Sequence, residues 1–420
     1  MEDYDVIVVG ASVAGCTTAT LMGRRGLKVA LIERHRRPST HKVLCTHFIH
    51  ASATPVVRRL GLDELIEAAG GIPNELDVWT PWGWVTPPPG EPAGYNLRRE
   101  RLDPMLRQLA AETPGVDLLT GQRVVDLVAS GKGVAGVRVR GGDGREHLLR
   151  SRLVVGADGA RSSVAQLAGA RERVKPNRRS FHFAYFTGVS LSSGHRSQTW
   201  LRNPDVAYAF PNDDGLTLLA YFPAPDSGAF TSDRQTTLTA AFGALPDGPA
   251  LDGAQQVSKV ISASDYPIMV RPAVPAPGLA LVGDAALTSD PTFGVGCEWA
   301  FRGAEWLADA VTEPLVDGGR LGPALRRYRR CRRALRGHQT FIEFNARGRP
   351  FTPLDRLLLS AAVRDPAAAA ELVAFFHGRL PLHRFASPTA IARAIRTRRR
   401  AAPQVTSATS ERQAPSRPLP

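Results

Sequence analysis

The sequence predicts an α/β fold with three parts: a domain built on a parallel sheet, an antiparallel-sheet domain interleaved with it, and a set of C-terminal helices. Three observations predict these parts. A strand, a tight turn, a helix and a second strand follow one another at the N-terminus. Alternating apolar runs separated by turn sequences fill the middle, and an arginine-rich stretch with helical spacing follows residue 318. No segment recurs with the period of a repeat protein.

The N-terminal unit is typical of a Rossmann-like dinucleotide site. It reads as the strand DVIVV (5–9), a helix at roughly Ala14–Arg25 and the strand KVALIE (28–33), with VVGASVAGCT across the first turn. The glycine fingerprint of such sites needs one glycine for the turn and one for close packing of helix on strand. Gly10 and Gly15 keep these two roles.

Two further residues of this unit point to the nucleotide. Ser12 stands where the fingerprint has its middle glycine, and its small hydroxyl side chain can itself donate to a phosphate oxygen. The helix N-terminus still faces the anion. Glu33 ends the second strand, where its carboxylate can accept hydrogen bonds from the adenosine ribose and disfavours a 2′-phosphate.

A literal match to G-x-G-x-x-G occurs at GKGVAG, 131–136, but its sequence context argues against a dinucleotide-binding loop. RVVDLVAS before it and VRVRG after it read as two strands, so we expect a hairpin turn there. The antiparallel sheet is expected at about 173–264, where apolar runs are separated by NPD, NDDG and PDSG turns. Alternation in SFHFAYFTGV places Phe181, Phe183 and Tyr185 on one face, and His182, Ala184 and Phe186 on the other.

Charge and composition limit the possible classes. The net charge of +14 belongs to the C-terminal region alone, because residues 320–400 hold nineteen arginines and four acids. LRRYRRCRRALR (325–336) carries Leu325, Tyr328 and Leu335 near helical spacing, which favours an amphipathic helix with a solvated basic face over a nucleic-acid site. An acidic partner protein or an anionic surface is the alternative. The Pro/Ser/Thr-rich end, 401–420, predicts a disordered tail.

The chain is expected to be a cytoplasmic protein. Only Met1–Asp5 precede the first apolar run, which leaves no room for a signal peptide, and no apolar stretch is long enough to span a bilayer. Four scattered cysteines, Cys16, Cys45, Cys297 and Cys331, indicate reduced thiols and no metal site.

Two distant segments identify the family. SRLVVGADGARSSV (151–164) and GLALVGDAALTSDPTFGVGCEWAFRGAEWLADA (278–310) each begin as a buried strand that delivers an aspartate to the carboxyl edge of a sheet. Together with the N-terminal fingerprint, the Asp158-Gly159 and Gly283-Asp284 motifs resemble those of the FAD-dependent monooxygenases of the para-hydroxybenzoate hydroxylase-like family, over roughly the first 310 residues.

This resemblance implies roles for individual residues. Asp284 would bind the ribityl chain of FAD, and the loop that opens the following helix would face the flavin pyrimidine edge with its backbone N–H groups. Asp158 would contact FAD and the nicotinamide donor, with a helix cap as the alternative role. Arg99, in the R-x-x-L-D stretch, would reach the FAD phosphates. The whole expected cofactor set is Gly10, Ser12, Val13, Ala14, Gly15, Glu33, Arg34, Arg99, Val124, Asp158, Gly283, Asp284, Pro291, Gly294, Val295, Gly296 and Cys297.

The resemblance also suggests catalytic residues. VLCTHFIH resembles an S-T-H segment of related bacterial enzymes, with Cys45 in place of the serine, so Thr46 and His47 would lie near the isoalloxazine. A satisfied structural histidine is the alternative for His47. The chain departs from the same enzymes at Leu287 and Thr288, where they often have an aromatic residue and a histidine.

The implied domains are discontinuous. The FAD-binding domain would comprise 1–75, 96–172 and 265–318, the substrate domain 76–95 and 173–264, and the basic helical region 319–400.

The implied activity is hydroxylation or epoxidation of a hydrophobic or aromatic small molecule in secondary metabolism, through a flavin C4a-hydroperoxide. NAD(P)H would bind transiently as electron donor, or a separate flavin reductase would supply reduced flavin; a carrier protein is a further possible partner.

Three alternatives remain open from the residues. Trp82, Trp84 and Pro87 partly match a flavin-dependent halogenase signature, and YAFPN (208–212) partly echoes that of a geranylgeranyl-type reductase. The third alternative is a non-enzymatic flavin-binding interaction protein.

Overall fold

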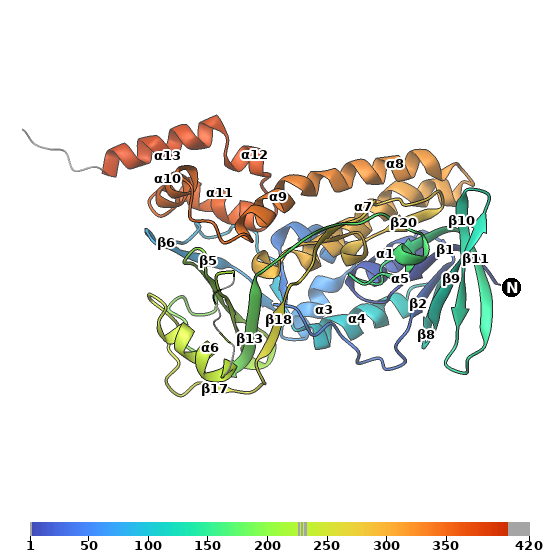
Figure 1. Ribbon diagram of the computed structural model, residues 1–420, viewed down its shortest axis with the longest axis horizontal. Helices are drawn as coiled ribbons and strands as arrows, with labels where there is room; N and C mark the ends of the chain where they lie inside the picture. Colours follow the sequence, from blue (N-terminus) through green and yellow to red (C-terminus); the bar gives the residue numbers. More distant parts are fainter. Residues whose placement is uncertain (1, 226, 228–229, 231–232, 402–420) are drawn as a thin grey trace, which may run out of the picture.

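The computed structural model describes residues 2–225, 227, 230 and 233–401. Two large sheets lie at opposite ends of the molecule, and the C-terminal helices pack beside the second one (Figure 1). The predicted tail, 402–420, lies outside the described residues.

The first sheet has the strand order β8-β2-β1-β11-β10-β9, with β20 also paired to β11. Strands β8, β2, β1, β11 and β20 run parallel, and β9 and β10 are antiparallel additions. Its strands are β1 (Glu2–Val9), β2 (Val29–Glu33), β8 (Val116–Thr120), β9 (Arg123–Ser130), β10 (Gly133–Arg140), β11 (Glu146–Gly156) and β20 (Leu279–Leu281). The predicted hairpin at GKGVAG is confirmed, because it joins β9 to β10.

The carboxyl ends of β1, β11 and β20 meet at one edge of this sheet, with Val9 opposite Gly156 and Gly156 opposite Leu281. The predicted first helix is confirmed as α1 (Val13–Gly23), and it packs against α4 (Arg99–Ala111) and α7 (Gly296–Val316). The topology therefore brings the turns after residues 9, 156 and 281 together although they are far apart in the sequence.

The second sheet has the order β17-β13-β16-β15-β14-β5-β6, with β18 paired to β13. Its strands are β5 (Leu76–Thr80), β6 (Gly83–Val85), β13 (Ser180–Thr187), β14 (Ser197–Leu201), β15 (Val206–Pro211), β16 (Thr217–Phe222), β17 (Gln255–Gln256) and β18 (Ile261–Ser264). The sheet is antiparallel as predicted except for one pair, because β14 runs parallel to β5. A long connection lies between β5 and β14, which permits a parallel pair.

Both faces of the second sheet are covered. Phe181 and Phe183 pack in one apolar cluster with the C-terminal helices, whereas Ala184 and Phe186 pack in another against α6 (Arg234–Gly243). The predicted alternation in β13 is therefore confirmed.

Two three-stranded sheets join these parts: β3 (Phe48–Ile49), β7 (Tyr95–Asn96) and β4 (Ile72–Pro73), and β12 (Arg173–Lys175), β19 (Ile268–Val270) and β21 (Leu287–Thr288). Shorter helices complete the core regions: α2 (Thr54–Arg59), α3 (Leu62–Ala68) and α5 (Ser163–Leu167), with the 3₁₀ turns η1 (Ala51–Ala53), η2 (Asp213–Gly215), η3 (Gly283–Ala285), η4 (Pro291–Phe293) and η5 (Arg333–Leu335).

The C-terminal part is helical, as predicted. Its helices are α8 (Leu321–Arg332), α9 (Arg336–Asn345), α10 (Pro353–Ala362), α11 (Pro366–Phe376), α12 (Leu382–Phe385) and α13 (Pro388–Ala401). Leu325 and Tyr328 of α8 are buried, as is Leu335 just after it, whereas Arg326, Arg329 and Arg330 are exposed. The amphipathic basic helix is thus confirmed.

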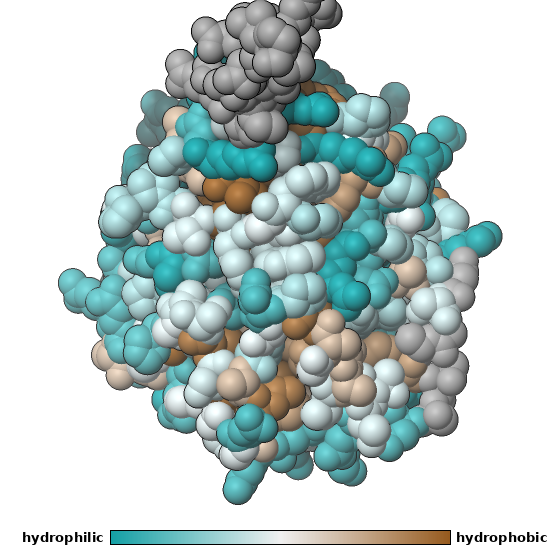
Figure 2. All heavy atoms as spheres, turned by 90° about the vertical axis from the view of Figure 1, so that its left-hand side faces the viewer, coloured by the Kyte–Doolittle hydropathy of each residue, from teal (hydrophilic) through white to brown (hydrophobic). Residues whose placement is uncertain are grey.

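The end of the molecule that carries α10–α13 and α6 has a mixed surface, in which hydrophilic side chains separate small hydrophobic areas (Figure 2). Within the part of the chain that the structure describes, no helix combines the length and apolarity needed to cross a membrane.

Candidate active site

The glycine loop after β1 is shaped for close backbone approach. Gly10 has φ +103°, and a Cβ there would lie 2.6 Å from the carbonyl oxygen of Ala157. A Cβ on Gly15 would lie 1.7 Å from the carbonyl oxygen of Gly10, so only glycine fits. Helix α1, which includes Val13 and Ala14, has neither a side-chain cap nor an acidic residue in its first turn. Its first N–H groups are thus left for an anion, which fits the pyrophosphate of a dinucleotide.

Glu33 lies directly against this loop. One carboxylate oxygen accepts the N–H of Ala11 at 3.0 Å and the other accepts the N–H of His35 at 2.9 Å. The carboxylate therefore stands beside the loop, where the fingerprint expects the adenosine ribose. Arg34 is exposed and donates to His35, and the side chain of Val124 is buried in the core of the first sheet.

Arg99 lies in the middle of the site. Its guanidinium is buried, donates to Ser12 Oγ at 2.7 Å and pairs with Asp103. The charge of Asp103 raises the pKa of Arg99 although burial opposes it. The R-x-x-L-D stretch, on α4, thus places a permanent positive charge at the glycine loop, as expected of a group that meets phosphates.

Asp158 is engaged within its own segment. Its carboxylate accepts hydrogen bonds from the hydroxyls of Ser162 and Ser163 and, at 3.1 Å, from the N–H of Val164. The backbone of Asp158 also packs against Gly10. This geometry agrees with the alternative, capping role of Asp158, because its side chain organises the start of α5.

The Gly283-Asp284 motif follows β20, and a Cβ on Gly283 would lie 2.9 Å from the Cβ of Ala14 on α1. Asp284 accepts hydrogen bonds from Lys42 Nζ at 2.7 Å and from the Tyr266 hydroxyl at 3.2 Å. Burial opposes the charge on Lys42, yet the carboxylate of Asp284 raises its pKa. The motif is thereby tied to the segment that follows β2.

The loop before α7 combines a 3₁₀ turn with a left-handed glycine. Pro291 begins the turn, and Gly294 ends it with φ +63°. Val295 and Gly296 then start α7 without a side-chain cap, followed by Cys297. A Cβ on Gly294 would lie 3.5 Å from Thr46 Oγ1, so Thr46 faces this loop.

His47 is held by protein groups on both ring nitrogens. Nδ1 accepts the N–H of Arg99 at 3.0 Å, so Nε2 carries the ring hydrogen and donates to the hydroxyl oxygen of Tyr185. Its backbone is left-handed, with φ 62°. These contacts agree with the structural role weighed for His47, because neither nitrogen is free for a substrate.

An apolar pocket opens beside Gly294 and is called the inner pocket here. It has about 400 Å³ of empty volume. Aromatic residues of β15 form part of its wall, and His50, whose Nε2 is hydrogen-bonded to the carbonyl oxygen of Phe293 at 2.8 Å, also lines it. Its lining residues are Phe48, His50, Leu76, Thr199, Leu201, Tyr208, Phe210, Phe293, Gly294 and Phe376.

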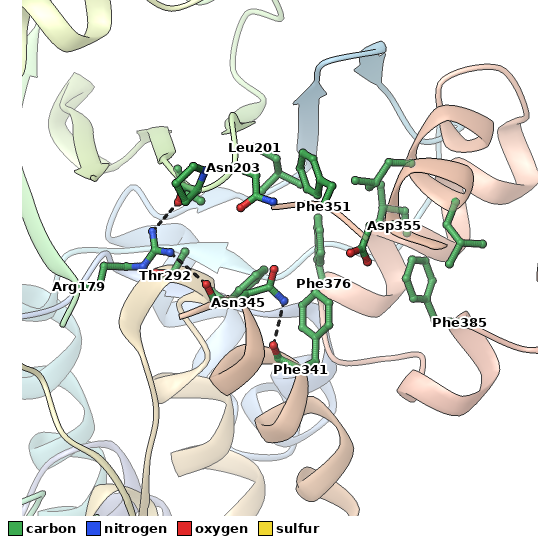
Figure 3. Close-up of a pocket in the computed structure, with 16 residues that line it drawn as sticks. Arg179, Leu201, Asn203, Thr292, Phe341, Asn345, Phe351, Asp355, Phe376 and Phe385 are labelled. Carbon is green, nitrogen blue, oxygen red and sulfur yellow. Dashed lines mark hydrogen bonds between the residues drawn. The ribbon is translucent and has the colours of Figure 1, made fainter. Parts of the chain in front are cut away.

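A second cavity, the outer pocket, has about 610 Å³ of empty volume and shares Leu201, Phe293 and Phe376 with the inner one. Phe341, Phe351 and Phe385 of the C-terminal region gather around it (Figure 3). On its sheet side the buried Arg179 donates to backbone carbonyls of Pro204 and Asn345 at 2.8 and 3.1 Å. The two pockets are therefore neighbours, and together their lining residues reach from Gly294 to α10–α12.

The two signature tryptophans do not line the inner pocket. Trp84 packs on Trp200 and donates to Asp247, and Trp82 packs on Phe351. Both belong to the β5–β6 hairpin.

Several residues of the site were not predicted from the sequence. Lys42, Asp103, Tyr185, Tyr266 and His50 all contact expected site residues or line the inner pocket. Asp103 could have been found, because it is the aspartate of the R-x-x-L-D stretch. The others make contacts with no local sequence signal.

Three of the relatives to which the chain is similar carry the names of enzymes. It is 26% identical over 350 residues to digeranylgeranylglycerophospholipid reductase 1 of Methanococcoides burtonii, covering 80% of this chain and 81% of that one. It is 24% identical over 340 residues to the 1H-pyrrole-2-carbonyl-[peptidyl-carrier protein] brominase of Pseudoalteromonas luteoviolacea, covering 76% and 79%. It is 26% identical over 341 residues to aklavinone 12-hydroxylase DnrF of Streptomyces peucetius, covering 70% and 64%.

The fold and the family agree with these similarities. The solved structure of the flavin-dependent brominase Bmp2 superposes with a TM-score of 0.75 at 19% identity, covering 95% of this chain and 99% of that one. The FAD binding domain family matches residues 3–338. The chain therefore belongs to the FAD binding domain family and is an FAD-dependent oxidoreductase with the para-hydroxybenzoate hydroxylase-like fold.

Proposed function

We propose that this protein is an FAD-dependent monooxygenase that hydroxylates or epoxidises a hydrophobic or aromatic small molecule. The observation that carries the proposal is the inner pocket, which places aromatic walls beside Gly294. In this proposal the pocket holds the substrate next to the flavin, and its apolar lining excludes water from the reacting atoms.

The residues around the glycine loop would hold the cofactor. The free N–H groups of α1 and the guanidinium of Arg99 would meet the diphosphate, Glu33 the adenosine ribose and Asp284 the ribityl chain. When bound and reduced, FAD supplies the reaction of dioxygen that delivers one oxygen atom. The N-terminus of α7 would stabilise negative charge at the flavin pyrimidine edge.

The electron donor in this proposal is NADH or NADPH. Its binding is transient, and delivery of reduced flavin by a separate reductase is the alternative. Mixing the FAD-loaded protein with each nicotinamide in the absence of oxygen, while flavin absorbance is recorded, separates these cases. Bleaching by NADH or NADPH alone supports a direct donor.

A tethered substrate is a further possibility within this function. The brominase relative is named for a substrate on a peptidyl-carrier protein. The exposed arginines of α8 lie on the helix that leads into α9, and α9 lines the outer pocket through Phe341 and Asn345. A carrier protein with an acidic surface would fit such a basic helix face.

A geranylgeranyl-type reductase is the second candidate, and one observation favours it. Tyr208 and Phe210, the aromatic residues of the partial signature YAFPN, both line the inner pocket. A reductase would use the same apolar space to hold an unsaturated chain, and it would transfer hydrogen to a double bond without dioxygen.

Isotope analysis of the product tests the function. The FAD-loaded protein, NAD(P)H and a panel of apolar aromatic and polyunsaturated compounds are incubated under oxygen-18 gas with halide present. We expect one oxygen-18 atom in the product. A product that gains two hydrogens under anaerobic conditions would instead establish the reductase, and a halogenated product the halogenase.

A further inference from the structure

Two cysteines from distant parts of the chain meet beside the candidate cofactor site. Cys45 lies just before β3 and Cys297 lies in the first turn of α7, yet their sulfur atoms are 3.9 Å apart. A disulfide needs an S–S separation of about 2.05 Å, so closing the gap requires a shift of about 2 Å. Side-chain rotation and small backbone adjustment can supply such a shift.

The surroundings of the pair favour a thiolate. Arg99 Nη1 lies 3.8 Å from Cys45 Sγ and 3.7 Å from Cys297 Sγ, and the backbone N–H of His47 donates to Cys45 Sγ at 3.3 Å. The hydrogen bond from the Cys297 thiol, a hydrogen bond from His47 and the charge of Arg99 hold the pKa of Cys45 well below its usual range, although burial opposes this shift. The same hydrogen bond and burial raise the pKa of Cys297. Cys45 is thus the nucleophile and Cys297 the neutral partner.

The other two cysteines differ in surroundings. Cys16 is fully buried in α1, and burial raises its pKa far above the usual range. Cys331 is half-buried on α8, and within the part of the chain that the structure describes neither Cys16 nor Cys331 is hydrogen-bonded to another sulfur. They therefore serve as internal comparisons for reactivity.

We propose that Cys45 and Cys297 form a redox-active dithiol that hydrogen peroxide oxidises to an intramolecular disulfide. The Cys45 thiolate attacks one peroxide oxygen, which forms an S–O bond, breaks the O–O bond and, with one proton, releases water. The Cys297 sulfur then attacks the Cys45 sulfur, which forms the S–S bond and breaks the S–O bond. The thiol proton of Cys297 leaves with the hydroxyl as a second water.

The two sulfurs together lose two electrons, and one peroxide molecule is reduced to two water molecules. Peroxide is also what reduced flavin releases when it meets dioxygen without transferring oxygen to a substrate; this source, unlike the dithiol itself, rests on the proposed function. The disulfide would join the segment before β3 covalently to the start of α7, and it would remove the thiolate that faces Arg99.

Peroxide titration of the full-length, FAD-loaded protein tests the dithiol without needing a substrate. We expect loss of two titratable thiols together, an intact mass lower by two hydrogens, and a non-reducing peptide map that links Cys45 to Cys297. Dithiothreitol should restore both thiols. Oxidation of Cys45 to sulfinic acid while Cys297 stays a free thiol would overturn the proposal, and so would thiols that all remain free.

Variants sharpen the test. Cys45→Ser and Cys297→Ser should each abolish the cross-link, whereas Cys331→Ser, which removes a cysteine outside the pair, should keep it. Serine is close to cysteine in size, and the resembling S-T-H segment has serine at the position of Cys45, so this variant is expected to fold. A cross-link that persists in Cys45→Ser, or one that disappears in Cys331→Ser, would contradict the assignment. The wild-type peptide map decides the question even if a variant fails to fold.

Discussion

At the scale of single residues, Gly15 is the glycine, among those that the structure describes, where an added Cβ would make the closest contact. A Cβ there would lie 1.7 Å from the Gly10 carbonyl oxygen, so Gly15→Ala must push α1 away from β1. We expect the variant to lose more than about 2 kcal/mol of unfolding free energy and most of its bound FAD. Flavin absorbance of the purified protein and a thermal melt measure both effects.

Gly243 provides the matched control for this prediction. It is also a helical glycine, at the end of α6, but a Cβ there meets nothing within 4 Å. Gly243→Ala should therefore leave FAD content and melting temperature unchanged or slightly raise the latter. If both variants keep wild-type FAD, the steric account of the glycine loop is wrong.

The sequence could locate site residues whose roles depend on nearby positions in the chain. Gly10, Gly15 and Glu33 belong to one strand–turn–helix–strand unit, and the structure brings them together. Lys42 reaches Asp284 across 242 positions, and His47 meets Tyr185 across 138, so no spacing rule could pair them. Asp158 shows a different limit. Its motif was clear in the sequence, but the sequence left its role open between cofactor contact and a helix cap, and in the structure its side chain is hydrogen-bonded at the start of α5.

At the scale of elements, helices α7, α9 and α11 bury a group of histidines around Glu298. His50 and His377 have ring centroids 5.5 Å apart, and His338 packs on Trp299 of α7. Burial lowers the pKa of His50 and of His377, and it lowers that of His338 to about 4, although Glu298 opposes the shift for His50 and His338. These side chains are thus neutral in the folded protein at neutral pH.

This burial predicts acid sensitivity. The unfolded chain protonates its histidines below about pH 6.5, whereas the folded protein keeps His338 neutral down to about pH 4, so acid favours unfolding across this window. Burial of His338 does not change the pH dependence of the free energy of unfolding above pH 6.5. Between pH 6.5 and pH 4 it lowers this free energy by at most about 3 kcal/mol. His338→Gln should therefore flatten the loss of melting temperature between these pH values, while the exposed His195→Gln should not. Equal slopes in both variants would show that His338 does not drive the loss.

The elements themselves were largely predictable, since periodicity and turn sequences are local. The parallel pairing of β14 with β5 was not, because it depends on a segment inserted more than 100 positions earlier in the chain. The short strands β3, β4 and β7 were also missed. Their two-residue lengths are too short to show alternation.

At the scale of the whole molecule, the inner and outer pockets arise only where three parts meet. The loop before α7 supplies Phe293, the second sheet supplies Leu201 and the C-terminal helices supply Phe376. The sequence indicated an aromatic face on a strand of the middle sheet, through Phe181, Phe183 and Tyr185, but it did not indicate that α9–α12 line a cavity. The C-terminal region therefore shapes the candidate substrate space in addition to carrying the positive charge.

The basic face of α8 gives the last prediction. Arg332, part of the same arginine run, donates to the carbonyl oxygen of Arg271 at 2.9 Å, and burial lowers its pKa, so it is structural and is left unchanged. Three exposed arginines on one face are replaced by glutamine, which keeps long helix-compatible side chains: Arg326, Arg329 and Arg330. The matched control removes three exposed charges from α13: Arg396, Arg398 and Arg399.

If the α8 face docks an acidic carrier protein, association is steered by charge and weakens with salt. Turnover of a carrier-bound substrate should then fall several-fold in the α8 variant at low salt, and less at high salt, where the wild type is already slowed. Turnover of a free substrate analogue should stay unchanged, and the α13 variant should behave as wild type. A fall of equal size with both substrates, or in both variants, would show that the arginines act only through net charge or stability. No change at all would assign them to a solvated helix face.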